Sequence, residues 1–251
     1  MNMNIAIIGA GAIGGAVAEG LLKADFGHVT LSNPTASKLQ RFARMGASVT
    51  TDNQAAADEA DVVIIAVKPW LVEQVVTSLD LKGKTVVSLA AGITSEQLLG
   101  WIAPDADLWL AIPNIAASLL TSMTFLVEVR NERNARIKDL FDAIGLTIPC
   151  KENVLPAGTA LGSCGIAYVM RYIRAQMEGG CEMGFYPQQA KQIALQTMQG
   201  AVSLLKETGW HPEEAIDKVT TPGGVTIKGL NELDHAGFNS AVIRSLKAGL
   251  K

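Results

Sequence analysis

The chain has 251 residues, of which 49% are hydrophobic, and its formal net charge is −3 at pH 7. This length is sufficient for one large domain or two smaller ones, and the weakly acidic charge argues against a nucleic acid or an anionic membrane surface as a partner. No stretch approaches the roughly 18 consecutive apolar residues of a membrane span, and residues 1–4 lack the basic segment of a signal peptide. We therefore expect a cytoplasmic protein that acts on a small molecule.

The three cysteines, Cys150, Cys164 and Cys181, are odd in number and show no C-x-x-C spacing. We expect buried free thiols in a reducing compartment rather than disulfides. No cluster of His, Cys, Asp or Glu has the spacing of a metal site, so no metal is expected.

A glycine-rich turn follows the first predicted strand, Ile5–Ile8, which is short and β-branched. Gly9, Gly11 and Gly14 have the spacing G-x-G-x-x-G, and helical periodicity follows over residues 16–22. In this setting the first glycine permits a tight turn, the second lets a pyrophosphate approach the backbone, and the third lets the helix pack closely on the strand. The helix N-terminus offers N–H groups to phosphates. We interpret the segment as a dinucleotide site rather than a plain glycine-rich turn, with contacts from Gly9, Gly11, Ala12, Ile13 and Gly14.

The turn after the second predicted strand, Val29–Ser32, contains no carboxylate. NAD enzymes place Asp or Glu about 20 residues beyond the fingerprint, on the ribose 2′-hydroxyl. The hydroxyls, the amide and the lysine of residues 32–38 suit a 2′-phosphate instead. We therefore favour NADP over NAD, the alternative being an ordinary capped turn into a helix over residues 35–45. The expected contacts are Asn33, Pro34 and Lys38.

Further strands are predicted at residues 47–50, 61–67 and 84–89, with a short helix between the first two that Asp52 caps. Ligands bind at the carboxyl ends of parallel strands, so the residues that follow the latter two strands border the cofactor. Lys68 either contacts a phosphate or ribose or is simply solvated. The expected cofactor contacts here are Ala66, Val67, Lys68, Pro69, Ala90 and Gly92.

Strands at residues 108–112, 123–129 and 146–150, with a helix over 131–144, complete the first domain. This alternation predicts an α/β fold with a doubly wound, Rossmann-type parallel sheet. A polar break at residues 151–153 suggests domains at 1–151, which binds NADP, and 152–251, which is smaller and all-helical. Helices are expected within 157–183, over 188–207, from Pro212, up to Asp234 and over 239–250.

A second glycine pair, Gly223 and Gly224, follows Pro222 and directly precedes a predicted helix. Backbone N–H groups and the helix dipole would form an anion nest there, suited to a substrate carboxylate, and Thr226 adds a hydroxyl. The alternative is a plain turn between helices.

Alcohol oxidation needs a base, usually His or Lys, yet residues 159–174, which are expected to face the nicotinamide, contain neither. A protonated imine already carries the charge that makes its carbon electrophilic, and its nitrogen needs only a hydrogen-bond partner, either a threonine hydroxyl or water. The combination favours imine reduction over a β-hydroxyacid-type dehydrogenase.

Several motifs are shared, nearly from end to end, with one enzyme family. They are Gly9-x-Gly11-x-x-Gly14, Ala66-Val67-Lys68-Pro69, Ala90-Ala91-Gly92, Pro113-Asn114, Ala167-Tyr168 and Thr221-Pro222-Gly223-Gly224-Val225-Thr226-Ile227. On these residues the chain resembles the pyrroline-5-carboxylate reductase family. The resemblance implies NADPH-dependent reduction of 1-pyrroline-5-carboxylate to L-proline by a homodimer that the helical domain intertwines, with higher oligomers possible.

The same resemblance implies that the substrate, a cyclic imino acid, binds at the dimer interface with its carboxylate on the Gly-Gly-x-Thr loop. It carries over Asn114 as a cofactor contact and Thr226 as the catalytic residue. The implied substrate contacts are Ser163, Cys164, Gly165, Thr221, Gly223, Gly224 and Val225.

The chain departs from the family pattern at Leu110, Ile115, Cys164 and Ile166. The typical Arg-x-Met-Pro-Asn-Thr-Pro stretch has here lost its arginine, threonine and second proline, which would make the pocket more apolar. The open alternatives are therefore a different cyclic imine as substrate, or an NADP-binding protein without catalysis.

Overall fold

The computed structural model describes residues 3–133 and 135–250. They form two compact units, the first ending at Ser163 and the second beginning at Cys164. The predicted domain boundary after residue 151 stays a prediction. In the structure, residues 155–163 pack in the first unit, where Phe125 lies against Gly158 and Gly162.

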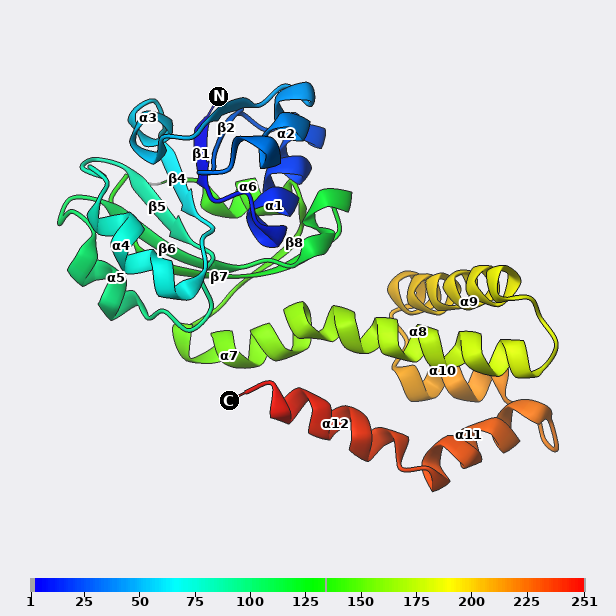
Figure 1. The fold of residues 1–251 in the computed structure, drawn as a ribbon. Helices are drawn as coiled ribbons and strands as arrows, with labels where there is room; N and C mark the ends of the chain where they lie inside the picture. The colour runs from blue at the N-terminus through cyan, green and yellow to red at the C-terminus, as the bar shows by residue number, and fades with distance from the viewer. Residues whose placement is uncertain (1–2, 134, 251) are drawn as a thin grey trace. The chain divides into compact units, whose positions relative to one another are not determined.

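The first unit is built on one eight-stranded sheet with the order β3-β2-β1-β4-β5-β6-β7-β8 (Figure 1). All neighbouring strands are parallel except β6 and β7, so the predicted doubly wound, Rossmann-type sheet is confirmed with one antiparallel pair added. The strand order reverses beside β1 and β4, where such folds bind dinucleotides. The bounds are β1 Asn4–Ile8, β2 His28–Ser32, β3 Ser48–Thr50, β4 Val62–Ile65, β5 Thr85–Ser88, β6 Asp107–Ile112, β7 Ser122–Arg130 and β8 Gly145–Pro149.

Helices bury both faces of this sheet. Alternate residues of a strand point to opposite faces, and those of the central strands are apolar on both. Ile5 and Ile7 of β1 lie in one core cluster with residues of α1, α2 and α6, whereas Ala6 and Ile8 lie in the other with residues of α3, α4 and α5. The bounds of these helices are α1 Ala12–Lys23, α2 Gln40–Arg44, α3 Asn53–Asp58, α4 Val72–Thr77, α5 Ser95–Trp101 and α6 Ile137–Asp142.

Several helix ends agree with the sequence signals. Asp52 accepts hydrogen bonds from the backbone N–H groups of Gln54 and Ala55, as its predicted capping role requires. Thr94 forms a capping box with Gln97 at the start of α5. Pro69 is the first residue of a short 3₁₀ helix, Pro69–Leu71.

Two predicted helices are shorter than expected. Residues 35–45 form a 3₁₀ turn, Ala36–Lys38, and then α2, since Thr35 and Ser37 favour turn geometry over a continuous helix. The helix predicted over 131–144 is α6, which begins only at Ile137. The Asn131 side chain accepts a hydrogen bond from Ala135 N at 2.7 Å, which favours a turn. Residue 134 lies outside the described residues.

The second unit is all-helical, as predicted, and α8 is central to it. The α8 residue Gly180 lies against Ala190 of α9, and the Tyr168 hydroxyl donates to the Ser245 carbonyl of α12 at 3.2 Å. The rings of Tyr172 in α8 and Phe238 in α12 pack in a tilted arrangement with their centres 5.9 Å apart. The bounds are α8 Gly165–Glu182, α9 Pro187–Thr208, α10 Pro212–Val219, α11 Val225–His235 and α12 Phe238–Ala248; α7, Leu155–Gly158, belongs to the first unit.

Two further features bear on the expectations from sequence. The three cysteines are free, but Cys181 is exposed and the other two are half-buried, so the expectation of buried thiols is wrong. Cys181 lies in the last turn of α8, at the start of a run of exposed residues, 181–189. Among the described residues, no helix combines the length and apolar character needed to cross a membrane.

Candidate functional site

The glycine-rich loop between β1 and α1 is shaped by close backbone contacts. A Cβ on Gly14 would lie 2.1 Å from the Gly9 carbonyl oxygen, and one on Gly9, whose φ is +115°, would lie 2.7 Å from the Ala66 carbonyl oxygen. Only glycine fits at either position without moving the backbone. At Gly11, by contrast, an added Cβ would meet nothing within 4 Å. The loop therefore leaves open space at the position that was assigned to the pyrophosphate.

The N-terminus of α1 fits a phosphate group. Gly11 is its N-cap and provides no side-chain hydrogen bond, so the first N–H groups of the helix have no capping partner. Gly11 and Ala12 are exposed, and Ile13 is half-buried. Uncapped N–H groups and the positive end of the helix dipole together make an anion site. The loop therefore fits a dinucleotide pyrophosphate.

The turn after β2 is fastened to this loop by Asn33, which is only 8% exposed. Its side-chain oxygen accepts from Ala10 N and its amide donates to the Thr35 carbonyl, both at 3.3 Å. Pro34 and Lys38 are exposed on the same turn. The side-chain amide of Asn33 is thus engaged in holding two loops together.

Asn53, which the sequence analysis missed, joins this edge from α3. Its side-chain oxygen accepts a 2.6 Å hydrogen bond from the hydroxyl of Ser32, the last residue of β2. The signal for it was available, since Asn53 comes soon after the carboxyl end of β3, the same edge at which the other candidate residues gather.

The ends of β4 and β5 contribute small residues and one lysine. Ala66 and Ala90 are buried, Val67 and Pro69 are half-buried, and Gly92 is exposed with φ +81°. Lys68 is exposed, and its ammonium lies 5.9 Å from the ring centre of Trp70, which is 76% exposed. These ends therefore offer little side-chain bulk at the edge of the sheet.

Asn114 follows the end of β6, and both polar atoms of its side-chain amide form hydrogen bonds within the protein. It accepts from Ala116 N at 3.0 Å, which caps the 3₁₀ helix Ile115–Leu119, and donates to the Gly162 carbonyl at 2.8 Å. Gly162 lies in a π-helix, Thr159–Cys164, a rare form that is frequent at functional sites. Asn114 therefore ties the edge of the sheet to the segment that contains Ser163 and Cys164.

The structure brings all fifteen candidate cofactor contacts to one edge of the sheet, because β1, β2, β4, β5 and β6 run parallel and end together. Ser163 also belongs to the first unit, whereas the other candidate substrate residues belong to the second. Of the residues that depart from the family pattern, Leu110 is 3% exposed in the sheet core, but Ile115 is 50% exposed.

The second glycine pair has the expected turn. Gly224 N donates to the Thr221 carbonyl at 2.9 Å, and Gly223 has φ +72°, the conformation that a type II turn needs after proline. Gly224 is the N-cap of α11 and provides no side-chain hydrogen bond. Val225 is 84% exposed and Thr226 is exposed. The start of α11 thus presents uncapped N–H groups beside a hydroxyl.

Two titratable groups have shifted pKa values, and both lie in the first unit. Burial raises the pKa of the Cys150 thiol, with a smaller opposing effect from a backbone hydrogen bond, so the thiol stays protonated at neutral pH and is a poor nucleophile. The pKa of Asp142 is lowered: partial burial opposes the shift, but hydrogen bonds from Lys138 and Thr147 outweigh it. Neither residue belongs to the edge described above.

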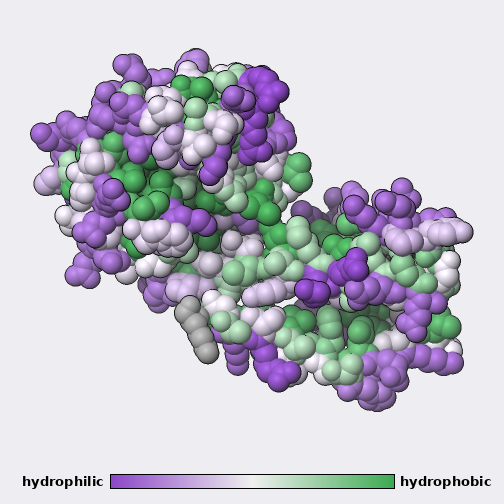
Figure 2. All heavy atoms as spheres, in the orientation of Figure 1, coloured by the Kyte–Doolittle hydropathy of each residue, from purple (hydrophilic) through white to green (hydrophobic). Residues whose placement is uncertain are grey.

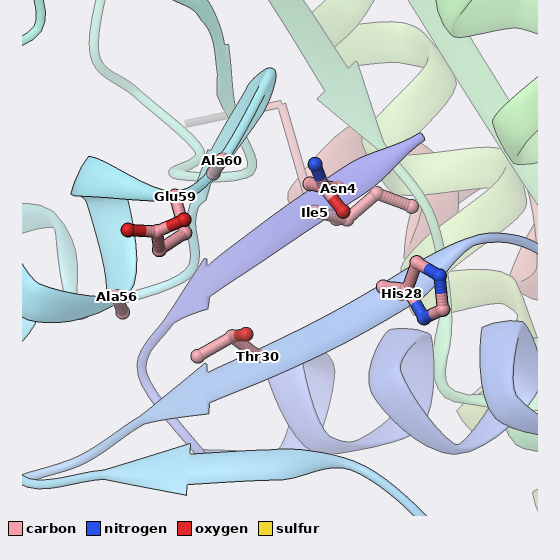
Figure 3. A pocket seen from close by; sticks show the side chains of 7 residues that line it. All are labelled: Asn4, Ile5, His28, Thr30, Ala56, Glu59 and Ala60. Carbon is pink, nitrogen blue, oxygen red and sulfur yellow. The ribbon is translucent and has the colours of Figure 1, made fainter. Parts of the chain in front are cut away.

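The opposite edge of the sheet has a shallow pocket (Figure 3). Asn4 and His28, the first residues of β1 and β2, line it together with Thr30 and Glu59, so it lies at the amino ends of the strands. It does not belong to the candidate cofactor site. Within residues 3–133 and 135–250, no three or more His, Cys, Asp or Glu side chains are grouped so that they could hold a metal ion.

Family models match both parts of the chain. Residues 152–251 match a model described as pyrroline-5-carboxylate reductase dimerisation, and residues 4–92 match one described as NADP oxidoreductase, coenzyme F420-dependent. The first unit thus contains an NADP-binding domain, and the helical part contains a dimerisation domain.

Individual relatives match over nearly the whole chain. Pyrroline-5-carboxylate reductase 1 of Dictyostelium discoideum is 35% identical over 262 residues, 96% of this chain and 48% of that protein, so the chain spans about half the length of this relative. Pyrroline-5-carboxylate reductase 2 of the same organism is 33% identical over 271 residues, 98% of this chain and 90% of the relative. The solved 1-pyrroline-5-carboxylate reductase of Streptococcus pyogenes aligns with a TM-score of 0.89 at 31% identity, covering 99% of this chain and 97% of that one.

Proposed function

The chain belongs to the pyrroline-5-carboxylate reductase family of NAD(P)H-dependent oxidoreductases, and we propose that it reduces 1-pyrroline-5-carboxylate to L-proline with NADPH. The observation that carries the proposal is a pair of uncapped helix N-termini, each preceded by glycines. One, at α1, fits a dinucleotide, and the other, at α11, fits a small carboxylate.

The cofactor is held by the carboxyl edge of the sheet. The N–H groups at the start of α1 would bind the pyrophosphate, with open space at Gly11 for its approach, and the small residues at the ends of β4 and β5 would leave room for the rest of the cofactor. Bound NADPH supplies a hydride. Asn114 positions the adjoining segment through its two hydrogen bonds, to Ala116 and to Gly162.

The substrate carboxylate is held by the N–H groups of α11 that follow Gly224. With NADPH bound, the imine carbon would gain a C–H bond from the supplied hydride, the π electrons of the protonated C=N bond would become the nitrogen lone pair, and NADPH would be converted to NADP⁺. The Thr226 hydroxyl serves as hydrogen-bond partner for the nitrogen. No base has to remove a proton, in agreement with the absence of His and Lys over residues 159–174.

A homodimer is part of this proposal, because the helical unit has too little core to be stable alone. Gly180, Ala190 and Ala194 are the only buried residues among its described ones. Figure 2 shows hydrophobic residues on its visible surface, and large apolar side chains such as Met170, Ile193 and Ile243 are about half exposed. A second copy that covers them would complete the core, as obligate dimer interfaces do.

The test is an assay of the purified chain with NADPH and 1-pyrroline-5-carboxylate, following NADPH absorbance and proline formation together. We expect one proline for each NADPH consumed. A panel of other cyclic imines, run alongside, addresses the exposed Ile115, whose apolar side chain stands where the family has threonine. If the protein binds NADPH but turns over none of the imines, the enzymatic role is refuted and the alternative, an NADP-binding protein without catalysis, is supported. Sedimentation of the same sample tests the dimer.

A further inference from the structure

The side chain of Arg41, in α2, rests on the first turn of α1, at the same edge of the sheet as the glycine-rich loop. A Cβ built on Gly15 would lie 2.9 Å from the Nη2 atom of Arg41. The absence of a side chain at Gly15 therefore provides the space that the guanidinium occupies. The positive charge of Arg41 thereby lies one helical turn from the uncapped N–H groups that begin after Gly11.

An aromatic ring supports the guanidinium of Arg41. Its central carbon lies 4.4 Å from the ring centre of Phe42, which is fully buried. A guanidinium that lies over a ring keeps the N–H groups that point away from the ring available for an anion. Arg41 is therefore a supported cation rather than a freely moving one.

The charge of Arg41 is only weakly neutralised by its neighbour. Glu19 lies 4.0 Å from it, whereas the same carboxylate makes a 2.7 Å ion pair with Lys23. The side chain of Arg41 is 57% exposed, so an anion from solution can reach it. Residues 32–45 contain no Asp or Glu, so no carboxylate of the turn or of α2 competes for the guanidinium.

We propose that Arg41 is a specificity-determining residue that binds the 2′-phosphate of NADPH and thereby selects NADPH over NADH. The role rests on the proposed function, in which the start of α1 binds the pyrophosphate of NADPH, and on the expectation from the sequence that the turn after β2 lies beside the 2′-phosphate. Asn33 is unsuited to it, because its amide is engaged with Ala10 and Thr35. Lys38, the cation expected from the sequence, is exposed on a 3₁₀ turn and would be an auxiliary contact.

The experiment measures binding, so that it does not depend on turnover. The intact protein is titrated calorimetrically with 2′,5′-ADP, which carries the distinguishing phosphate, and with 5′-AMP, which lacks it. The variants are Arg41→Ala, Arg41→Lys and Lys38→Ala. Arg44→Ala is the matched control, because Arg44 lies on the same helix and donates to the carbonyl of Gln40 in its own helix.

We expect Arg41→Ala to weaken 2′,5′-ADP binding by about tenfold or more and 5′-AMP binding by less than about twofold, as loss of one charge-assisted contact requires. Arg41→Lys should be intermediate, Lys38→Ala should lose less than Arg41→Ala, and Arg44→Ala should bind like the wild type. Gly15→Ala should also weaken 2′,5′-ADP binding, because its methyl group would displace the guanidinium.

Three results would overturn the inference. They are wild-type binding of 2′,5′-ADP no tighter than that of 5′-AMP, an Arg41→Ala variant that keeps full 2′,5′-ADP affinity, or a larger loss in Lys38→Ala. Failure of the proposed function is a separate result, namely absence of imine turnover by wild-type protein that binds these nucleotides normally.

Discussion

Replacing Gly14 by alanine tests whether the glycine-rich loop is shaped by packing at one position and by ligand access at another. The new Cβ would lie 2.1 Å from the Gly9 carbonyl oxygen and 2.8 Å from the Cβ of Ala66, so α1 must move away from β1. A shift of roughly 1 Å in a packed core costs about 1–3 kcal/mol. In a protein of this size that lowers Tm by about 2–4 °C for each kcal/mol.

Gly11→Ala is the matched control, because an alanine there meets nothing within 4 Å and φ is −75°. Alanine is a poorer N-cap than glycine but reduces the entropy of the unfolded chain, and these effects nearly cancel, so the stability should change by less than about 0.5 kcal/mol. The same methyl group stands where the pyrophosphate approaches, so we expect NADPH affinity to fall at least about tenfold.

Thermal unfolding of both variants, with and without NADPH, separates the two effects. At a concentration 100 times Kd, a ligand stabilises the folded state by about 2.7 kcal/mol, and a tenfold weaker affinity removes about half of that. Gly14→Ala should be destabilised without ligand, whereas Gly11→Ala should lose mainly the NADPH-induced shift. The reasoning is refuted if Gly14→Ala is as stable as wild type, or if Gly11→Ala binds NADPH with wild-type affinity.

Substitutions at three other positions test the remaining parts of the account. Asn114→Ala should lower stability by about 1–3 kcal/mol in urea unfolding, because the Gly162 carbonyl loses its donor and a cap is lost; an unchanged midpoint would show that these hydrogen bonds contribute nothing. Thr226→Ala should lower kcat about tenfold or more with NADPH affinity unchanged, and Thr226→Ser should recover most of kcat; equal loss of affinity and kcat would contradict the assigned role. The pKa of Asp142 is lowered from its ordinary value of 3.8, so its carboxylate stabilises the folded state above pH 3.8. This stabilisation is lost as the pH falls through the folded-state pKa of Asp142. Between pH 6 and pH 3 the unfolding free energy of Asp142→Asn should therefore fall less steeply than that of the wild type, and parallel curves would refute the assignment.

The central strands could be predicted from the sequence because they are short and apolar, and because glycine or proline follows within a few residues of the ends of β1, β4 and β6. The antiparallel pairing of β7 with β6 could not, since a strand of alternating polarity can pair with its neighbour in either direction. The π-helix at Thr159–Cys164 also lacks a sequence signal of its own, as its geometry arises where Gly158 and Gly162 pack on Phe125.

The cofactor edge was largely predictable, because the carboxyl ends of parallel strands meet there whatever their side chains are. Asn53 and Arg41 were missed for a physical reason. Asn53 accepts a hydrogen bond from Ser32, and Arg41 lies against Gly15. Both contacts join segments that are distant in the sequence, so they depend on how those segments pack. The helices of the second unit follow from prolines at their starts, such as Pro187 and Pro212. What covers the apolar side chains that this unit leaves exposed could not be predicted from local patterns, and we propose that a second copy does so.

Isotope transfer gives the most direct test of the central claim that the chain delivers a hydride to a cyclic imine. The purified protein is incubated with 1-pyrroline-5-carboxylate and NADPH deuterated at the transferring C4 position, and the proline formed is analysed by mass spectrometry and NMR. The account predicts one deuterium per proline, located on the ring carbon that was double-bonded to nitrogen. Unlabelled proline, or no proline from protein that binds NADPH, would contradict it.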